Sequence, residues 1–312
     1  MTSWLDEHPE IRNVRAGAAD LNGQARGKRV PIRFARKLEE DGMRFPLSVL
    51  NLDIWGEDVE DSPLVFEIGD PDGLLMPTER GYVPLPWLET PSAMLPLWMY
   101  TEEGEAFGGD PRHALANVLE RYKALGLTPV VATEMEFYLV DDSGIEIRQP
   151  KSPRSGKRRP GAEILSLRAL DAFDAFFNDL YDGCDAMDIP TEAATSEVGL
   201  GQFEINLVHV DDALKAADDA YFFKMLVRGL ARRHGMAASF MAKPYADYAG
   251  SGMHVHFSVI DKDGNNVFAN DTFEGTPLLH HAIAGCLKGI ADLTLIFAPH
   301  GNSYDRLRSE EH

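Results

Sequence analysis

The sequence predicts an α+β fold of two domains, on three observations. The chain has 312 residues, which is long for a single hydrophobic core. Short apolar segments typical of β-strands occur together with longer amphipathic segments of helical period. Gly108-Gly109-Asp110-Pro111 is the best candidate boundary, because Asp110 can cap a helix that Pro111 begins. We therefore expect one domain at residues 1–108 and a second, larger domain at residues 109–312.

The composition is that of a soluble globular protein. Hydrophobic residues make up 44% and charged residues 26% of the chain, and no apolar run approaches the ~20 residues of a membrane span. The N-terminus lacks the basic and apolar regions of an export signal, so we expect a cytoplasmic location. Cys184 and Cys286 do not have the spacing of metal ligands, and we expect both to be reduced core residues.

The charge balance narrows the range of partners. There are 50 acidic and 30 basic residues, which gives a formal net charge of −20. Such a charge opposes binding to nucleic acid and to anionic membrane surfaces. It is compatible with metal ions or polyamines, although many cytoplasmic proteins are acidic for solubility alone.

In the first domain, strands surround one helix. Residues 11–19 have the pattern of a strand, and a turn follows at residues 20–23. Pro31 begins a helix that Gly42 ends. Further strands are expected at residues 45–52, 64–68 and 95–100.

The second domain mixes longer helices with strands. A helix from Pro111 to about Gly126 precedes a strand at residues 132–140. Further helices are expected at residues 169–187, 211–234 and 277–297, and further strands at residues 202–208, 237–243 and 253–260.

The strand A-T-E-M-E-F-Y-L-V at residues 132–140 carries two carboxylates on one face. Side chains alternate along a strand, so Glu134 and Glu136 point the same way. At roughly 7 Å and an effective dielectric constant near 20, the two charges repel by about 2.4 kcal/mol. A bound cation would remove this repulsion. The alternative is an edge strand whose glutamates face solvent.

Two other predicted strands also carry polar pairs. The side chains that share a face are Glu204 and Asn206 in residues 195–208, and His254, His256 and Ser258 in residues 248–259. Glu197 precedes the glycine-containing turn of the first segment. Either histidine alone is more often a hydrogen-bonded core residue. If the three faces converge, burying the charges would cost several kcal/mol each, and bound Mg²⁺ or Mn²⁺ would offset that cost.

At these residues the chain resembles the glutamine synthetase family. The matching segments, in the family's order, are E-M-E-F at 134–137, S-E-V-G-L-G-Q-F-E at 196–204, K-P at 243–244, G-S-G-M-H-V-H at 250–256 and N-S-Y-D-R-L at 302–307. A weaker match runs from D-L-N-G at 20–23 through R-G-K at 26–28. The resemblance implies a small β-grasp-like N-terminal domain and a catalytic domain with an open, funnel-like sheet. It also implies a ring-shaped homo-oligomer with active sites between subunits.

The resemblance assigns roles to individual residues. The implied ligands of two or three Mg²⁺ or Mn²⁺ ions are Glu134, Glu136, Glu197, Glu204 and His254. The implied nucleotide contacts are Glu192, His256 and Ser258; Gly250 would approach glutamate and Arg306 would pair with a substrate carboxylate as a catalytic residue.

The implied reaction is ATP-dependent amide formation. The γ-carboxylate of glutamate attacks ATP, and an amine then displaces phosphate from the γ-glutamyl phosphate. Where ammonia-using members carry F-D-G-S-S, this chain has N-L-D-I-W-G-E-D at 51–58. Residues 66–73 and 83–87 look instead like the γ-glutamylpolyamine (putrescine) synthetase branch, so we expect a polyamine acceptor. Ala249 stands where the family usually has asparagine, a departure next to the expected glutamate contact at Gly250.

The segment after N-S-Y-D-R-L departs most from the family. The family continues through a flap glutamate, several arginines and another metal ligand, whereas this chain has R-S-E-E-H at 308–312. We therefore expect a C-terminally truncated member of the ligase family, in which the loss of these groups together can abolish turnover. The alternatives are a nucleotide-binding or assembly subunit, a glutamine synthetase that uses ammonia and, least expected, a two-metal hydrolase.

Overall fold

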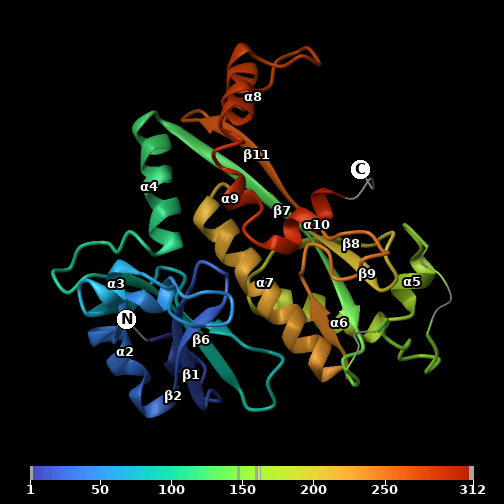
Figure 1. Cartoon of the computed structure of the whole chain (residues 1–312), viewed down its shortest axis with the longest axis horizontal. Helices are drawn as coiled ribbons and strands as arrows, with labels where there is room; N and C mark the ends of the chain where they lie inside the picture. The colour runs from blue at the N-terminus through green and yellow to red at the C-terminus, as the bar shows by residue number, and fades with distance from the viewer. Residues whose placement is uncertain (1–2, 146–147, 159–160, 162, 309–312) are drawn as a thin grey trace. The chain divides into compact units, whose positions relative to one another are not determined.

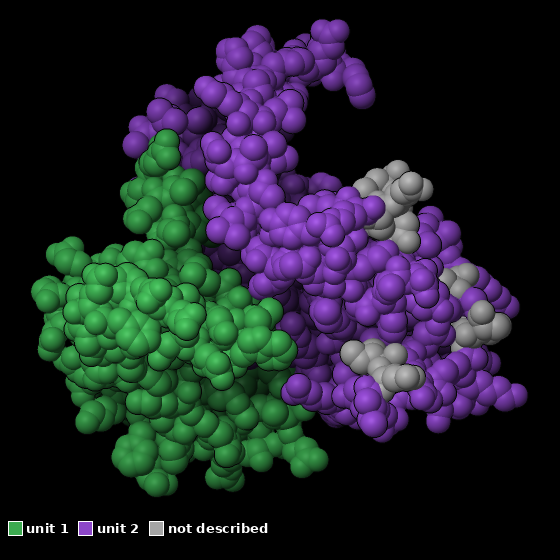
Figure 2. Space-filling model, in the orientation of Figure 1, with its two compact units in different colours: residues 1–121 green, residues 122–312 purple. Residues whose placement is uncertain are grey.

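The computed structural model describes residues 3–145, 148–158, 161 and 163–308 (Figure 1). By its internal contacts the chain divides into two compact units, residues 1–121 and 122–312 (Figure 2). Within the described residues, no helix is both long and apolar enough to cross a membrane.

Unit 1 is a mixed sheet crossed by one helix. Its elements are α1 (Trp4–Glu7), β1 (Asn13–Ala19), β2 (Ala25–Pro31), the 3₁₀ helix η1 (Ile32–Phe34), α2 (Ala35–Asp41), β3 (Met43–Pro46), the 3₁₀ helix η2 (Leu47–Leu50), α3 (Pro63–Phe66), β4 (Asp72–Pro77), β5 (Val83–Pro84) and β6 (Ser92–Tyr100). The strand order is β2-β1-β6-β4-β3, with β5 also paired to β6. Because β1 and β6 are parallel and α2 contacts β1 and β4, the β-grasp-like prediction is confirmed.

Two predicted strands of unit 1 are wrong. The strand expected at residues 45–52 ends at Pro46, and η2 follows it. The strand expected at residues 64–68 is the short helix α3, whose first residue is Pro63. A short apolar run fits both structures, and a proline with its fixed φ at the first helical position favours the helix.

Unit 2 is organised around one long strand. Its elements are β7 (Leu127–Val140), α5 (Leu167–Asp171), α6 (Asp174–Ala186), β8 (Thr191–Ser196), β9 (Gln202–Leu207), α7 (Ala213–Arg233), β10 (Ala237–Ser239), β11 (Met253–Asp261), α8 (Pro277–Gly289), α9 (Thr294–Phe297) and α10 (Gly301–Leu307). Helix α4 (Pro111–Ala124) contains the division between the units. β9 pairs with one edge of β7, β11 and β10 pair with the other edge, and β8 lies outside β9. The sheet is open, as predicted.

Helices α6 and α7 cover the apolar face of this sheet. Phe137 of β7 is fully buried and contacts Phe176 of α6, Phe203 of β9 and Phe223 of α7. Glu134 and Glu136 alternate with this buried set and are only half-buried. Burying one face of β7 therefore turns its two carboxylates to the other face. Cys184 is buried on α6, but Cys286 is exposed on α8, so the prediction of two core cysteines is wrong for Cys286.

Candidate metal and substrate site

Three neighbouring strands carry the polar pairs on one face. In the ladder between β7 and β9, Glu134 lies opposite Asn206 and Glu136 lies opposite Glu204. On the other edge of β7, Glu134 lies opposite His254 of β11. Residues directly opposite each other in a ladder have neighbouring side chains on one face. The strand register therefore gathers these groups around Glu134.

Glu134, Glu204 and His254 are close enough together to hold one metal ion. Each offers one ligand atom, and these three atoms lie within 4.8 Å of one another. Glu134 is also held by β11: its Oε2 lies 3.2 Å from Nδ1 of His254, and its Oε1 lies 2.8 Å from Nε2 of His256. All four side chains are half-buried or exposed, so an ion can reach them from solvent.

A second group surrounds Glu136. The Nε2 amide of Gln202 donates to Oε2 of Glu136 at 2.8 Å and to the carbonyl of Gly250 at 3.0 Å. A Cβ at Gly252 would lie 3.0 Å from Oε1 of Glu136 and 3.2 Å from a guanidinium nitrogen of Arg306. The glycine thus lets a carboxylate and a guanidinium approach the backbone closely.

The carboxylates perturb one another electrostatically. Burial raises the pKa of Glu197, and the charges of Glu136 and Glu204 raise it further. Burial and the charge of Glu134 raise the pKa of Glu204. Burial acts in the same direction on Glu134, but the hydrogen bonds and charges of its two histidine partners outweigh it and lower the pKa of Glu134. Such repulsion between carboxylates is what a divalent cation relieves.

The donor chemistry fits a hard divalent ion. Two carboxylates and one imidazole make the three-residue group, and two more carboxylates, Glu136 and Glu197, act electrostatically on the same set. Oxygen-rich sets of this kind favour Mg²⁺ or Mn²⁺ over metals that prefer thiolates.

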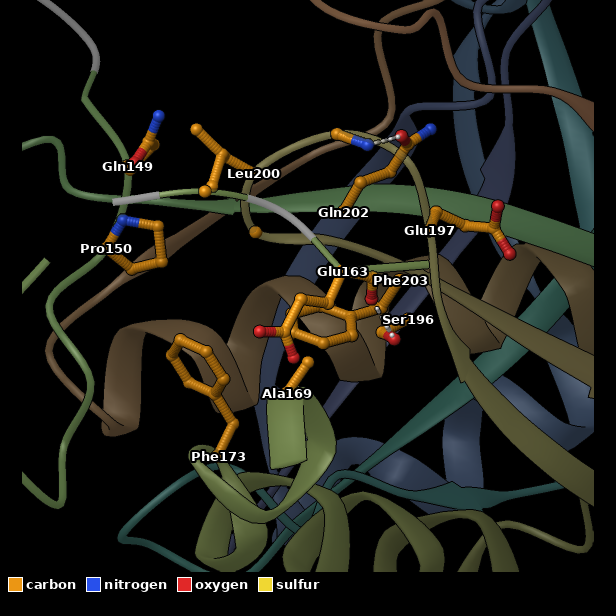
Figure 3. A pocket seen from close by; sticks show the side chains of 13 residues that line it. Gln149, Pro150, Glu163, Ala169, Phe173, Ser196, Glu197, Leu200, Gln202 and Phe203 are labelled. Atoms are coloured by element: carbon orange, nitrogen blue, oxygen red, sulfur yellow. Dashed lines mark hydrogen bonds between the residues drawn. The ribbon is translucent and has the colours of Figure 1, made fainter. Parts of the chain in front are cut away.

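A pocket lies beside Glu197, and Figure 3 shows the side chains that line it. Glu163 points towards Ala169 and Phe173, whereas Glu197 points away from them (Figure 3). Glu163 accepts a 2.7 Å hydrogen bond from Oγ of Ser166 and forms an ion pair with Arg168. No sequence pattern predicts Glu163 as a pocket residue, because it lies in a loop without strand or helix periodicity.

Arg306 and Gly250 are neighbours: a Cβ at Gly250 would lie 2.6 Å from Cγ of Arg306. The implied nucleotide residues are spread more widely. His256 contacts Glu134, Ser258 is half-buried farther along β11, and Glu192 is exposed on β8 beside a register shift.

Two further residues were missed. Gln202 precedes Glu204 by two positions on β9 and so shares its face, a signal that was available in the sequence. His209 follows β9, and its ring centroid lies 5.7 Å from that of His256. No periodicity predicts the position of His209.

Comparisons with known proteins agree with this geometry. Residues 108–312 match the family described as "Glutamine synthetase, catalytic domain". The chain is 39% identical to the γ-glutamylputrescine synthetase PuuA of Escherichia coli strain K12, with 98% of this chain and 65% of that protein covered. It is 32% identical to a glutamate–isopropylamine ligase of a Pseudomonas species, with 97% of this chain and 66% of that protein covered.

Solved structures show the same fold. A GmaS–ADP complex superposes with a TM-score of 0.83 at 28% identity and covers 98% of this chain and 66% of that one. A glutamine synthase homologue gives a TM-score of 0.84 at 25% identity, with 96% and 67% covered. The chain therefore spans about two thirds of the length of the relatives it matches. The resemblance seen in the motifs is confirmed, and the chain belongs to the glutamine synthetase family.

Proposed function

We propose that this chain forms the glutamate and metal site of an ATP-dependent ligase that joins the γ-carboxylate of glutamate to an amine. The observation that carries the proposal is the gathering of Glu134, Glu204 and His254 on one face, with Glu136 and Arg306 beside them. The family match and the names of the two relatives, which mention γ-glutamylputrescine and isopropylamine, support this reaction class.

Each residue of the site has a role in this proposal. The metal ligands are Glu134, Glu136, Glu197, Glu204 and His254, and the ions that they bind would neutralise phosphoryl oxygens of ATP. Arg306 pairs with a substrate carboxylate next to the backbone of Gly250. His256, Ser258 and Glu192 contact the nucleotide. Gln202 holds the Glu136 carboxylate in place through the bond described above.

The proposed acceptor is a polyamine. The support is the sequence at residues 51–58, 66–73 and 83–87, together with the 39% identity to the putrescine enzyme. The net charge of −20 also attracts a polycation.

The test is a ligase assay on the purified chain with ATP, Mg²⁺, glutamate and one amine at a time. ADP would be measured by a coupled assay and the γ-glutamyl amide by mass spectrometry. We expect ADP release to require glutamate and amine, with putrescine used in preference to isopropylamine and ammonium. ADP release without amine would support a hydrolase instead.

A second candidate is a nucleotide-binding or assembly subunit. Calorimetry showing Mg²⁺-dependent ATP binding, with no amide formed, would support this candidate over the ligase.

We also propose a ring-shaped homo-oligomer in the cytoplasm, with active sites between subunits. Light scattering after size-exclusion chromatography tests the ring. A mass of one chain, 34.6 kDa, at every concentration would contradict it.

A further inference from the structure

Two arginines of unit 1 face each other across neighbouring strands. In the antiparallel ladder between β1 and β2, Arg15 lies directly opposite Arg29. Residues directly opposite each other in such a ladder have neighbouring side chains on one face, and like charges there repel. Arg15 is half-buried and Arg29 is exposed. The sheet therefore holds two positive charges side by side, where a ligand can reach them from solvent.

The two guanidinium groups share one buried oxygen. Nη1 of Arg15 donates to Oδ1 of Asn13 at 3.3 Å, and Nε of Arg29 donates to the same oxygen at 3.1 Å. Oγ of Ser92, on the neighbouring strand β6, also lies 3.1 Å from it. Asn13 is 5% and Ser92 3% exposed, so this oxygen is fixed in the sheet. Because an amide oxygen carries no net charge, it orients the two guanidinium groups without neutralising them.

The charges of this arginine pair are not balanced by carboxylates. Within the part of the chain that the structure describes, neither Arg15 nor Arg29 forms an ion pair with Asp or Glu. The other arginine of β2, Arg26, lies 2.7 Å from the buried carboxylate of Asp20. Burial and the charge of Arg29 lower the pKa of Arg15. A chain with 50 acidic residues thus leaves two adjacent, oriented cations without a counter-charge.

The arrangement of donors fits a small dianion. A guanidinium group presents its N–H groups in a planar fork that matches the oxygens of carboxylate or phosphate. Beyond the bonds to Asn13, Arg15 and Arg29 keep N–H groups that bind no described atom. A phosphate group carries about −1.5 to −2 charges at neutral pH, so one phosphate neutralises both arginines. A single carboxylate would neutralise only one.

We propose that Arg15 and Arg29 bind a phosphate group, supplied by inorganic phosphate or by a small phosphorylated metabolite. Strands β1 and β2 of unit 1 carry both arginines, whereas the proposed metal ligands belong to unit 2. The proposal therefore does not depend on the ligase reaction. Binding removes the repulsion between the two arginines and stabilises the folded chain, because the ligand binds only the folded state.

The test measures binding to the full chain by calorimetry, without Mg²⁺ and at constant ionic strength. Inorganic phosphate and glycerol phosphate are titrated separately, and acetate serves as the monoanion. We expect saturable binding of phosphate and binding of acetate that is weaker by about tenfold or more. Tighter binding of glycerol phosphate than of phosphate would assign the site to a phosphorylated metabolite, and the reverse order to free phosphate. Acetate binding as tightly as phosphate would overturn the proposal.

Substitution of either arginine locates the binding. Arg15→Met and Arg29→Met should each weaken phosphate binding by about tenfold or more, because charge-assisted hydrogen bonds are lost. Arg33→Met is the matched control, since it removes the same charge from an exposed position of unit 1. It should change binding by less than about twofold. Equal weakening by Arg33→Met and Arg29→Met would reduce the effect to net charge and contradict the proposal.

A charge reversal gives a readout that loss of folding does not imitate. Arg29→Glu places a carboxylate opposite Arg15, so without phosphate this variant should melt at a higher temperature than wild type. With phosphate, wild type should gain more in melting temperature than Arg29→Glu, because general salt effects act on both proteins. A lower melting temperature of Arg29→Glu without phosphate, or an equal gain of both proteins with it, overturns the proposal.

Discussion

Glu204 tests the site at the scale of one residue. The pKa of Glu204 is raised in the folded protein. At low pH the side chain is protonated in both the folded and the unfolded state, so it does not affect stability. As the pH rises above the ordinary pKa near ~4.3, the charged carboxylate lowers the stability of the metal-free fold. Without metal, Glu204→Gln should match wild type below about pH 4 and melt at a higher temperature than wild type near neutral pH. Calorimetric scans across pH measure this. A lower melting temperature for Glu204→Gln at every pH would contradict it.

Adding Mg²⁺ should reverse that order. At neutral pH we expect the metal to raise the melting temperature of wild type and to leave Glu204→Gln nearly unchanged, because a ligand binding only the folded state stabilises it. Glu192→Gln is the matched control, since Glu192 is exposed on β8, the strand beside β9. Equal Mg²⁺ responses in all three proteins would remove Glu204 from the set of ligands.

The close packing around Gly252 predicts that a larger residue there would displace the Glu136 carboxylate. A Cβ there would lie 3.0 Å from Oε1 of Glu136, which is tighter than about nine in ten real Cβ contacts, so the carboxylate must shift by a few tenths of an ångström. Gly252→Ala should therefore displace Glu136 and weaken Mg²⁺ affinity by about tenfold, while the melting temperature of the metal-free chain falls little. Gly301→Ala, where a Cβ meets nothing, is the control. Isothermal titration with Mg²⁺ compares the two.

At the scale of elements, the packing of α6 and α7 on β7 sets the direction of the carboxylates. Phe137→Ala should lower the free energy of unfolding by about 3–5 kcal/mol, because it opens a cavity among the rings of Phe176, Phe203, Phe223 and Phe240. Phe273→Ala removes a fully exposed ring and should change the free energy of unfolding by less than about 0.5 kcal/mol. Urea denaturation followed by circular dichroism measures both. A loss below about 1 kcal/mol for Phe137→Ala would mean that this core does not fix the strand.

The elements also explain what could be predicted from the sequence. The alternation of buried and polar side chains along β7 could be predicted from the sequence because one face of the strand packs on helices. The same alternation along β9 places Gln202 on the face of Glu204. The order in which β9 and β11 flank β7 is set by long-range pairing, which periodicity does not encode. Glu163 sits in a loop whose path depends on bonds to Ser196, a residue 33 positions away. The strand predicted at residues 64–68 is wrong because Pro63 starts a helix in an apolar run.

For the whole molecule, the net charge of −20 makes a last prediction. Self-repulsion among 50 acidic residues destabilises the compact state, and salt screens it. Raising NaCl from about 0.01 M to 0.15 M should raise the melting temperature of the metal-free chain. Spermine at equal ionic strength should raise it further if polycations bind specifically. Identical responses to NaCl and spermine would leave screening as the whole effect.

Tyr138 couples two loops that the sequence separates by about fifty residues. Its hydroxyl donates to the carbonyl of Ala249 at 2.6 Å. A Cβ at Gly199 would lie 1.9 Å from the hydroxyl oxygen of Tyr138. Substitutions at positions 138 and 199 are therefore epistatic. A side chain at position 199 needs the Tyr138 phenol removed and the Gln202 amide oxygen, 2.6 Å from the same Cβ, moved aside; loss of the phenol also removes its hydrogen bond to the loop before Gly250. Sequence drift in one loop is thus limited by the other.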